Sequence, residues 1–227
     1  LHLVRVEHFA LPNLLAGERL VPELLQGAAN PAALGAEVLR VDRAERVRLP
    51  RPDGPNLDLL NRGRRSVAVD LKSPAGVEVV LRLVEKADAL IEGFRPGVMD
   101  RHEIGWEHLR AVNPRLVYCA ITAFGARGPL AQKPGMDLIL QATGGLMGHT
   151  GEEGGPPIKS APPVADINTG VYGAYAILGA LLARERTGEG QKVEVAMLDA
   201  VVSLFADNAC NVLTDGDTVT VIKDLKI

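Results

Sequence analysis

The sequence has little aromatic content, few cysteines and no long apolar run. Aromatic residues make up 4% of its 227 residues, so a core must be built from aliphatic side chains. Its two cysteines, Cys119 and Cys210, lie in apolar segments, which favours buried thiols in a reducing compartment over a disulfide framework. No segment is apolar over the length of a membrane span, and the first residues lack a signal-peptide pattern. These features predict a soluble protein of the cytoplasm or of an organelle matrix, with no membrane partner.

An excess of charge of one sign is also missing. Lys and Arg total 25 and Asp and Glu total 28, for a net charge of −3. This balance predicts no nucleic-acid partner, and a phosphate ligand would need a local group of arginines. The glycine-rich dinucleotide fingerprint, the P-loop, the G-x-S-x-G elbow and any His/Cys metal spacing are absent as well. Their absence predicts no metal site and counts against a Rossmann-like domain for some other nucleotide.

The first half alternates short β-branched runs with helical patterns, which is typical of an α/β protein. We predict a helix over 73–86, with Ser73 as its N-cap and Pro74 at its first position. Strands joined by such helices are expected to form a parallel sheet with helices on its faces. The predicted strands cover residues 3–9, 36–42, 66–71, 87–94 and 115–124.

After residue 124 the pattern changes to loops and helices. Segments 125–135 and 149–163 are rich in Gly and Pro and are predicted as loops. Helices are expected over 136–148, 167–188 and 198–213, and a strand over 191–197. The helix over 167–188 should stop at Arg184, Arg186 and Gly188, since basic residues followed by Gly commonly end a helix.

Two arginines follow predicted strands directly. Arg43 comes after the second strand and Arg95 after the fourth. In a parallel sheet these positions lie at the carboxyl ends of the strands, where open α/β folds bind ligands. Guanidinium groups suit phosphates. Ordinary surface arginines are the alternative interpretation of the same positions.

Asp166 stands in the segment VADINTG, between a proline-rich loop and an apolar helical pattern. An Asp at a helix start commonly accepts hydrogen bonds from the free N–H groups of the first turn, so a cap is one interpretation. Asn168 and Thr169 could cap equally well, and a catalytic nucleophile is the alternative. Asp137, in KPGMDLIL, allows the same two interpretations at the start of its own helix.

Six segments follow one another in order along the chain: LGAEVLRVDR, NRGRRSVAVDLKSPAG, ADALIEGFRPGVMDR, NPRLVYCAITAFGARGP, KPGMDLILQATGGLM and VADINTGVYGAYAILGALLARERTGEGQKVEVAMLDA. Taken together, they resemble the class III CoA-transferase family, which includes the α-methylacyl-CoA racemases. The resemblance implies a Rossmann-like parallel sheet with flanking helices, a smaller second domain and an interlocked homodimer. Residues 1–200 would be the CoA-binding domain with the catalytic Asp, and 201–227 would lead toward a second domain largely absent from this chain.

The resemblance also implies an activity. The substrate would be an acyl-CoA thioester and the partner a carboxylic acid, with no tightly bound cofactor. Asp166 would attack the thioester and pass through an anhydride and an aspartyl-CoA thioester, because a covalent route divides one difficult exchange into easier steps. Asp137 would position the acyl group or polarise Asp166. Family racemases carry a proton-exchanging His where this chain has Met136, so Met136 favours transfer over racemisation or epimerisation.

The CoA-binding positions are likewise implied by the resemblance. Family chains are longer than this one, and the glycine-rich loop that shields the intermediates lies after the matched region. A CoA-binding module without turnover is therefore a further alternative. The CoA-binding positions correspond to Arg43, Val69, Asp70, Leu71, Lys72, Gly93, Phe94, Arg95, Arg101, Gly135 and Met136.

Overall fold

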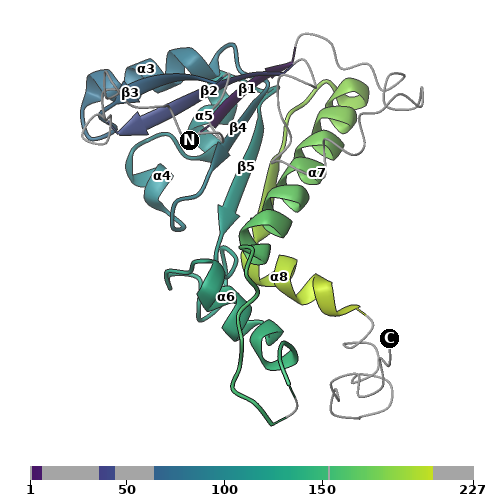
Figure 1. Cartoon of the computed structure of the whole chain (residues 1–227). Helices are drawn as coiled ribbons and strands as arrows, with labels where there is room; N and C mark the ends of the chain where they lie inside the picture. The colour runs from purple at the N-terminus through teal and green to yellow at the C-terminus, as the bar shows by residue number, and fades with distance from the viewer. Residues whose placement is uncertain (1, 7–35, 44–63, 153, 207–227) are drawn as a thin grey trace, which may run out of the picture. The chain divides into compact units, whose positions relative to one another are not determined.

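The computed structural model describes residues 2–6, 36–43, 64–152 and 154–206 (Figure 1). The chain forms two compact units. The first comprises Leu1–Ile121 and Gly173–Glu194, and the second comprises Thr122–Tyr172 and Val195–Ile227. We call them the sheet unit and the helical unit. The predicted division at residue 200 stays a prediction, since residues 207–227 lie outside the described part.

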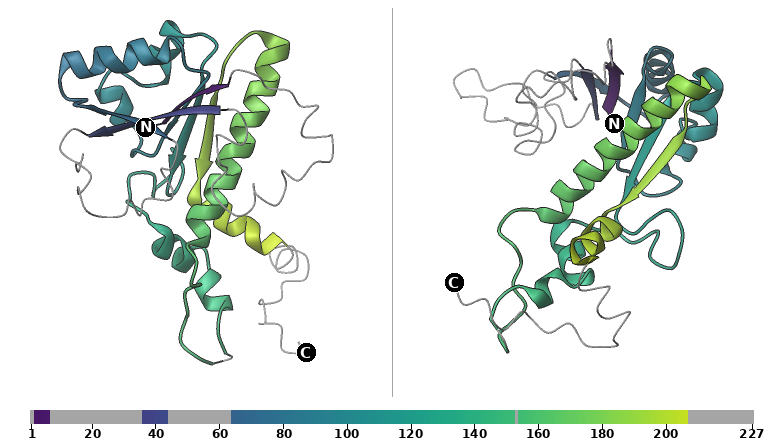
Figure 2. Two further views of the ribbon diagram at one scale, coloured as in Figure 1. Left: turned by 45° about the horizontal axis from the view of Figure 1, so that its top comes forward. Right: turned by 90° about the vertical axis from the view of Figure 1, so that its right-hand side faces the viewer.

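A six-stranded sheet forms most of the sheet unit. Parallel pairing joins β2 to β3 and β4 to β5, with Val41 opposite Val67 and Ile91 opposite Cys119. Figure 2 shows β6 beside β5, running in the same direction. The order across the sheet is β3 (Arg65–Val69), β2 (Ala36–Arg43), β1 (His2–Val6), β4 (Ala89–Glu92), β5 (Val117–Thr122) and β6 (Lys192–Ala196).

The prediction of a purely parallel sheet is wrong at β1. This strand pairs antiparallel with β2 on one side and with β4 on the other, with Val4 opposite Val38 and Ala89. Successive side chains of a strand alternate between the two faces in either direction, so the sequence pattern carries no information on strand direction. Because β1 reverses direction relative to both neighbours, β2 and β4 still run the same way.

The helix α3 (Pro74–Val84) begins as predicted. The Ser73 hydroxyl accepts a hydrogen bond from the Gly76 N–H at 3.1 Å, and Pro74 occupies the first turn, where its missing N–H costs nothing. Val80 and Val84 are fully buried on one face of the helix. They join a large aliphatic cluster with Leu90 and other side chains from β2 to β5, so burial of apolar surface holds this unit together.

Two short helices, α4 (Val98–Arg101) and α5 (Trp106–Val112), complete this part of the sheet unit. Leu109 of α5 is fully buried, and α5 packs against α3. The Trp106 ring meets the Tyr118 ring edge-on, with centroids 6.0 Å apart, an arrangement that aromatic pairs favour. The few aromatic residues therefore support a core that is otherwise aliphatic, as predicted.

Among the described residues, the core of the helical unit is much smaller. Leu140, Ala165 and Val201 form its buried cluster, with partly buried neighbours such as Phe205. The predicted helix over 198–213 is observed as α8 and η5, and residues 207–213 lie outside the described residues. Its elements are α6 (Asp137–Thr143), η4 (Leu146–His149), the first turns of α7, α8 (Met197–Val202) and η5 (Ser203–Phe205).

The helix α7 (Val164–Thr187) begins three residues earlier than predicted. Its carboxyl end lies in the sheet unit, where Arg184 is 8% exposed and places Nη2 2.9 Å from Asp88 Oδ1. The Gly188 N–H bonds to the Arg184 carbonyl, and Gly188 has φ +79°, so it closes the helix as predicted. Arg184 is therefore a buried ion-pair residue as well as part of a helix stop. Within the described ranges, no helix is both long enough and apolar enough to cross a membrane.

Candidate active site

The carboxyl ends of β2, β3 and β4 lie at the same end of the sheet, which we call the sheet edge. The register places Arg40 of β2 beside His2 of β1, and His2 beside Ile91 of β4. Arg43 lies three residues beyond Arg40 and directly opposite Val69, the last residue of β3. The structure thus brings the predicted residues after these three strands to a common edge, the position at which α/β sheets bind ligands.

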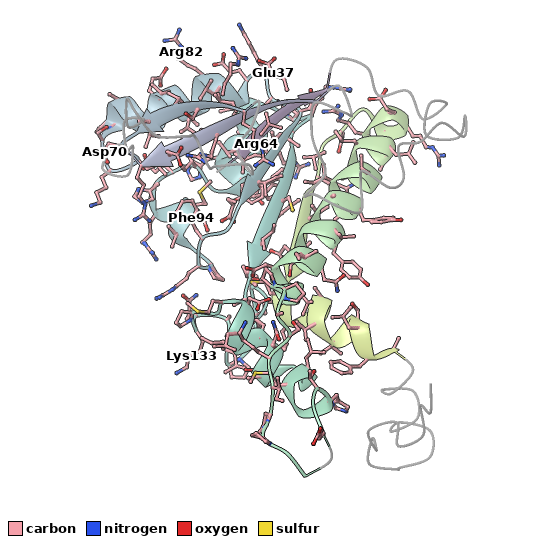
Figure 3. The ribbon with its side chains drawn as sticks, viewed as in Figure 1. Glu37, Arg64, Asp70, Arg82, Phe94 and Lys133 are labelled. Atoms are coloured by element: carbon pink, nitrogen blue, oxygen red, sulfur yellow. The ribbon has the colours of Figure 1, made fainter. Side chains whose placement is uncertain are left out.

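The turn after β3 is held by hydrogen bonds among its own residues. The Asp70 carboxylate accepts a hydrogen bond from the Lys72 N–H at 2.9 Å, and the Asp70 carbonyl accepts from the Ser73 N–H and hydroxyl. A Cβ on Gly76 would lie 1.9 Å from the Asp70 carbonyl oxygen, so only glycine fits there. Val69 is buried, Leu71 is half-buried, and Asp70 (labelled in Figure 3) and Lys72 are exposed. Such a turn presents backbone atoms and a cation at the sheet edge.

A buried carboxylate supports the segment after β4. Glu92 is 7% exposed, accepts a hydrogen bond from the Phe94 N–H at 2.7 Å and lies 3.3 Å from the Tyr118 hydroxyl, which donates to it. Burial raises the pKa of Glu92, and the hydrogen bonds from Phe94 and Tyr118 oppose this shift. Sequence reasoning missed Glu92, although a Glu that ends the apolar run ALIE is the signal that could have found it.

The predicted residues beyond Glu92 differ in their exposure. Phe94, labelled in Figure 3, is half-buried and packs against the main cluster, while Gly93 and Arg95 are exposed. Arg101 is exposed at the end of α4. Arg43 is exposed as well, so the three predicted arginines all keep their guanidinium groups available to a ligand. Whether these residues bind CoA stays a prediction.

In the helical unit, Asp137 and Asp166 are coupled through the start of α7. Asp137 is the first residue of α6, and its Oδ1 accepts hydrogen bonds from the N–H groups of Ala165 at 2.8 Å and of Asp166 at 3.4 Å. Two of the first-turn N–H groups of α7 are therefore bound by Asp137. The interpretation of Asp166 as the cap of its own helix is wrong, because Asp166 is itself the third residue of that helix.

The Asp166 side chain is exposed, and its pKa is raised. Partial desolvation is the larger cause and the negative charge of Asp137 is the second. The N-terminal end of a helix favours a negative charge, which partly offsets both effects. Asp166 therefore combines access to a ligand with a carboxylate more basic than usual, and both properties suit a nucleophile.

Asn168 and Thr169 have other partners. The Asn168 amide donates to the Ala200 carbonyl of α8, and the Thr169 hydroxyl donates to the Ala165 carbonyl at 2.6 Å. Asn168 thus ties α7 to α8, while Thr169 bonds back to the preceding turn of α7.

Gly135 and Met136 lead into α6. A Cβ on Gly135 would lie 2.4 Å from the Ala123 Cβ and 2.7 Å from Leu140 Cδ2, so the close packing there requires glycine. Met136 is 62% exposed, which leaves its side chain free to meet a ligand. The predicted site residues therefore fall into two sets. The sheet unit carries Arg43 to Arg101, and the helical unit carries Gly135, Met136, Asp137 and Asp166. No group of three or more His, Cys, Asp or Glu in the described part of the chain could hold a metal ion.

Comparisons with known proteins identify the family of the chain. The chain is 40% identical over 222 residues to the succinate–glutarate CoA-transferase of Agrobacterium fabrum, a match covering 89% of this chain and 55% of the relative. It is 39% identical over 221 residues to the succinyl-CoA:mesaconate CoA-transferase of Haloarcula hispanica, covering 88% and 56%. The chain thus spans about half the length of these curated relatives.

A solved structure supports the same assignment. The crystal structure of a CAIB/BAIF family protein from Brucella suis matches with a TM-score of 0.77 and 38% identity, over 83% of this chain and 53% of that one. The family model for CoA-transferase family III matches residues 27–224. On these matches, the chain belongs to CoA-transferase family III.

Proposed function

We propose that this protein moves CoA from an acyl-CoA thioester to a carboxylic acid, with Asp166 as the nucleophile. The observation that carries the proposal is the pairing of the two carboxylates. Asp137 binds the backbone N–H of Asp166, and the Asp166 carboxylate stays exposed with a raised pKa. A carboxylate with a raised pKa is more basic and is therefore a stronger nucleophile.

The first half of the reaction forms and breaks an anhydride. An Asp166 carboxylate oxygen attacks the thioester carbonyl carbon, the C–S bond breaks, and the electron pair leaves on the CoA sulfur. The thiolate then attacks the aspartyl carbonyl of the mixed anhydride. This releases the first carboxylate and leaves an aspartyl-CoA thioester on Asp166. Exclusion of water from these steps preserves the thioester bond energy.

The second half reverses the sequence with the acceptor. The acceptor carboxylate attacks the aspartyl thioester, and the thiolate leaves again. The thiolate then attacks the acyl carbonyl of the second anhydride, which gives the new acyl-CoA and restores the Asp166 carboxylate. Arg43, Arg95 and Arg101 would bind the phosphates of CoA, since guanidinium groups form charge-assisted bonds with phosphate oxygens.

The names of the relatives support short dicarboxylic acids as substrates. Both curated matches reported above are named for succinate or succinyl-CoA, with glutarate or mesaconate as the second acid. Racemisation is the weaker candidate. The residue before Asp137 is Met136, whose thioether cannot take up or deliver a proton at the pH of catalysis.

We further propose that the protein is an interlocked homodimer. We place its activity on acyl-CoA substrates in the cytoplasm. The helix α7 leaves Ile167, Val171 and Tyr175 exposed by 54%, 41% and 74%. These positions are four residues apart and so share one face of the helix. An exposed apolar face of this kind supports a protein partner, and the family resemblance supports a second copy of the chain.

The test uses succinyl-CoA and glutarate with the full chain. We expect isotope label to pass from glutarate to glutaryl-CoA, and hydroxylamine to trap Asp166 as a hydroxamate that peptide mass mapping locates. Asp166→Asn should abolish both signals. Asp199→Asn is the matched control, because Asp199 is an exposed acidic residue in the first turn of α8. Trapping at another residue, or CoA binding with neither signal in the unaltered protein, would refute the proposal.

A further inference from the structure

Gln141 is a fully buried polar side chain at the centre of a hydrogen-bond chain in the helical unit. Its exposed fraction is 0%. Gln141 Nε2 lies 2.6 Å from Asp137 Oδ2, one turn earlier on α6. Gln141 Oε1 lies 2.9 Å from the Ser160 N–H nitrogen and 3.2 Å from the Ser160 hydroxyl. The buried amide thus joins Asp137 to the segment that precedes α7.

The chemistry of the partners determines which way the amide is oriented. The Asp137 carboxylate can only accept hydrogen bonds, so it must face the NH₂ group. The Ser160 N–H can only donate, so it must face the carbonyl oxygen. Only a side chain with a donor and an acceptor can satisfy both neighbours, because a buried polar atom without a partner is costly. Position 141 therefore needs a side chain with a particular hydrogen-bonding capacity, and an apolar side chain of the same size would not be equivalent.

The other oxygen of Asp137 carries the connection onward. While Oδ2 accepts from Gln141, Oδ1 accepts from the N–H groups of Ala165 and Asp166. The two oxygens belong to one rigid carboxylate plane, so an interaction that orients one also orients the other. Asp166 is thereby connected to Gln141 through Asp137 and the first turn of α7.

We propose that Gln141 is a positioning residue: it orients the Asp137 carboxylate, which holds the first turn of α7 and with it the Asp166 backbone. The effect on catalysis rests on the proposed function, while the effect on hydrogen bonding does not. Gln141 touches no reacting atom in this scheme. Its contribution is to keep the nucleophile's backbone in one position while the side chain stays accessible.

Two substitutions separate positioning from packing. Gln141→Met keeps the length of the side chain but removes the donor and the acceptor. Gln141→Glu keeps the acceptor for Ser160 and can donate to Asp137 only when the introduced carboxyl group is protonated. A packing role predicts no dependence of either defect on pH. A positioning role predicts that only the Gln141→Glu defect recovers as the pH falls.

The first measurement follows the hydrogen bonds directly. In ¹H–¹⁵N spectra of the full chain, the Ala165 and Asp166 amide protons should resonate downfield, because a carboxylate accepts from them. Both should shift upfield in Gln141→Met at every pH. In Gln141→Glu both should shift upfield at pH 8 and return toward their original positions near pH 5. Gln191→Met, at an exposed position of the sheet unit, is the control and should leave both signals unchanged.

The second measurement uses turnover of succinyl-CoA with glutarate. A lost hydrogen bond to a charged group corresponds to a fall of about 10- to 100-fold in kcat for Gln141→Met, with KM for the acyl-CoA within about twofold. The kcat of Gln141→Glu, as a ratio to the unaltered protein at each pH, should rise from pH 8 to pH 5. Dividing the kcat of the variant by that of the unaltered protein at the same pH cancels the effect of titratable groups that both proteins contain.

The shared titratable groups around this site are few. Among the described residues of α6, of η4 and α8 that pack against it, of the segment that leads into α7 and of the first turn of α7, they are Asp137, Asp166, His149, Asp199, Glu152 and Lys159. His149 Nδ1 bonds to the Gly145 carbonyl at 2.9 Å, and Lys159 Nζ lies 3.4 Å from the Ser160 carbonyl. Since all of these groups are present in each variant, only the introduced carboxyl group can cause a variant-specific recovery.

The outcomes are distinguishable. If the amide signals stay in place in both variants, Gln141 has no positioning role, whatever the activity. If the signals move as expected and the unaltered protein shows no transfer, the positioning role stands and the proposed function fails. If Gln141→Met does not fold, Gln141→Glu, which keeps the size and polarity of the side chain, carries the test through its pH dependence. A pH-independent Gln141→Glu defect would overturn the inference.

Discussion

The sheet unit and the helical unit hold their proposed ligand-binding residues by different means. In the sheet unit, the exposed arginines lie at strand ends above a large buried aliphatic cluster that includes Val80, Val84 and Leu90. In the helical unit, the buried cluster consists of Leu140, Ala165 and Val201, and a hydrogen-bond chain through Gln141 and Asp137 does much of the positioning. Apolar burial tolerates small shifts in direction, whereas hydrogen bonds require defined angles. The difference fits the proposed roles, in which the sheet unit would bind CoA and the helical unit would orient the nucleophile.

The largest expected effects come from a matched pair of core substitutions. Leu90 and Leu140 are both 0% exposed, the first in the sheet unit and the second in the helical unit. We expect Leu90→Ala to lower the free energy of unfolding by about 3–5 kcal/mol and Leu140→Ala by about 2–3 kcal/mol, because the smaller cluster can relax around the cavity. Denaturant unfolding of both variants measures the difference.

An exposed position of α3 supplies the control for these two core substitutions. Val79→Ala, at a 40% exposed position of α3, should change the free energy of unfolding by less than about 0.5 kcal/mol. If Leu140→Ala lowered the free energy of unfolding more than Leu90→Ala does, the helical unit would depend on apolar packing at least as much as the sheet unit does.

The second prediction separates binding from chemistry. We expect Arg43→Ala and Arg95→Ala each to raise KM for acyl-CoA about tenfold with little change in kcat, since each removes a charge-assisted bond worth about 1.4 kcal/mol. Steady-state kinetics with succinyl-CoA measures this split. Arg82→Ala, an exposed position near the end of α3, is the control. A fall in kcat alone would place these arginines in the chemical step and remove the division of roles between the units.

The smallest expected effect concerns Asp166 and pH. Its pKa is raised above 3.8 in the folded state, so the folded protein binds its proton more tightly than the unfolded chain does. The stability from this group is present at low pH and is lost as the pH rises through the folded-state pKa. Asp166→Asn should therefore raise Tm at pH 7, by no more than about 2 °C for so exposed a group, and the gain should shrink toward pH 4.

Thermal unfolding at several pH values tests that prediction, with Asp199→Asn as the control. A lower Tm for Asp166→Asn at pH 7 would mean that the ionised carboxylate stabilises the fold, as a cap would.

Much of the local structure was predictable from the sequence. The helix α3 with its Ser73 cap and the strands β2 to β5 follow from apolar periodicity and capping chemistry, and these strands place Arg43 at the end of β2 and Arg95 shortly after β4. These patterns act over a few residues and so are readable locally. The family was identified correctly as well, because several ordered segments matched it.

Other features depended on contacts between distant residues. The reversed direction of β1, the cap that Asp137 supplies to α7 and the Gln141 hydrogen bonds to Asp137 and Ser160 were not predicted. Asp137 and Ala165 are 28 residues apart in the sequence. No local pattern records which of several carboxylates reaches a given helix end.

The family motif set, the two candidate carboxylates and the arginines near strand ends can all be identified in the sequence. The different roles of the two carboxylates follow from their contacts in the folded chain. Asp137 is bound on both oxygens, by Gln141 and by the first turn of α7, whereas Asp166 leaves its carboxylate exposed. The physical reason is that the chemistry of a carboxylate is set by its desolvation and its partners, and these come from chain segments that only folding brings together.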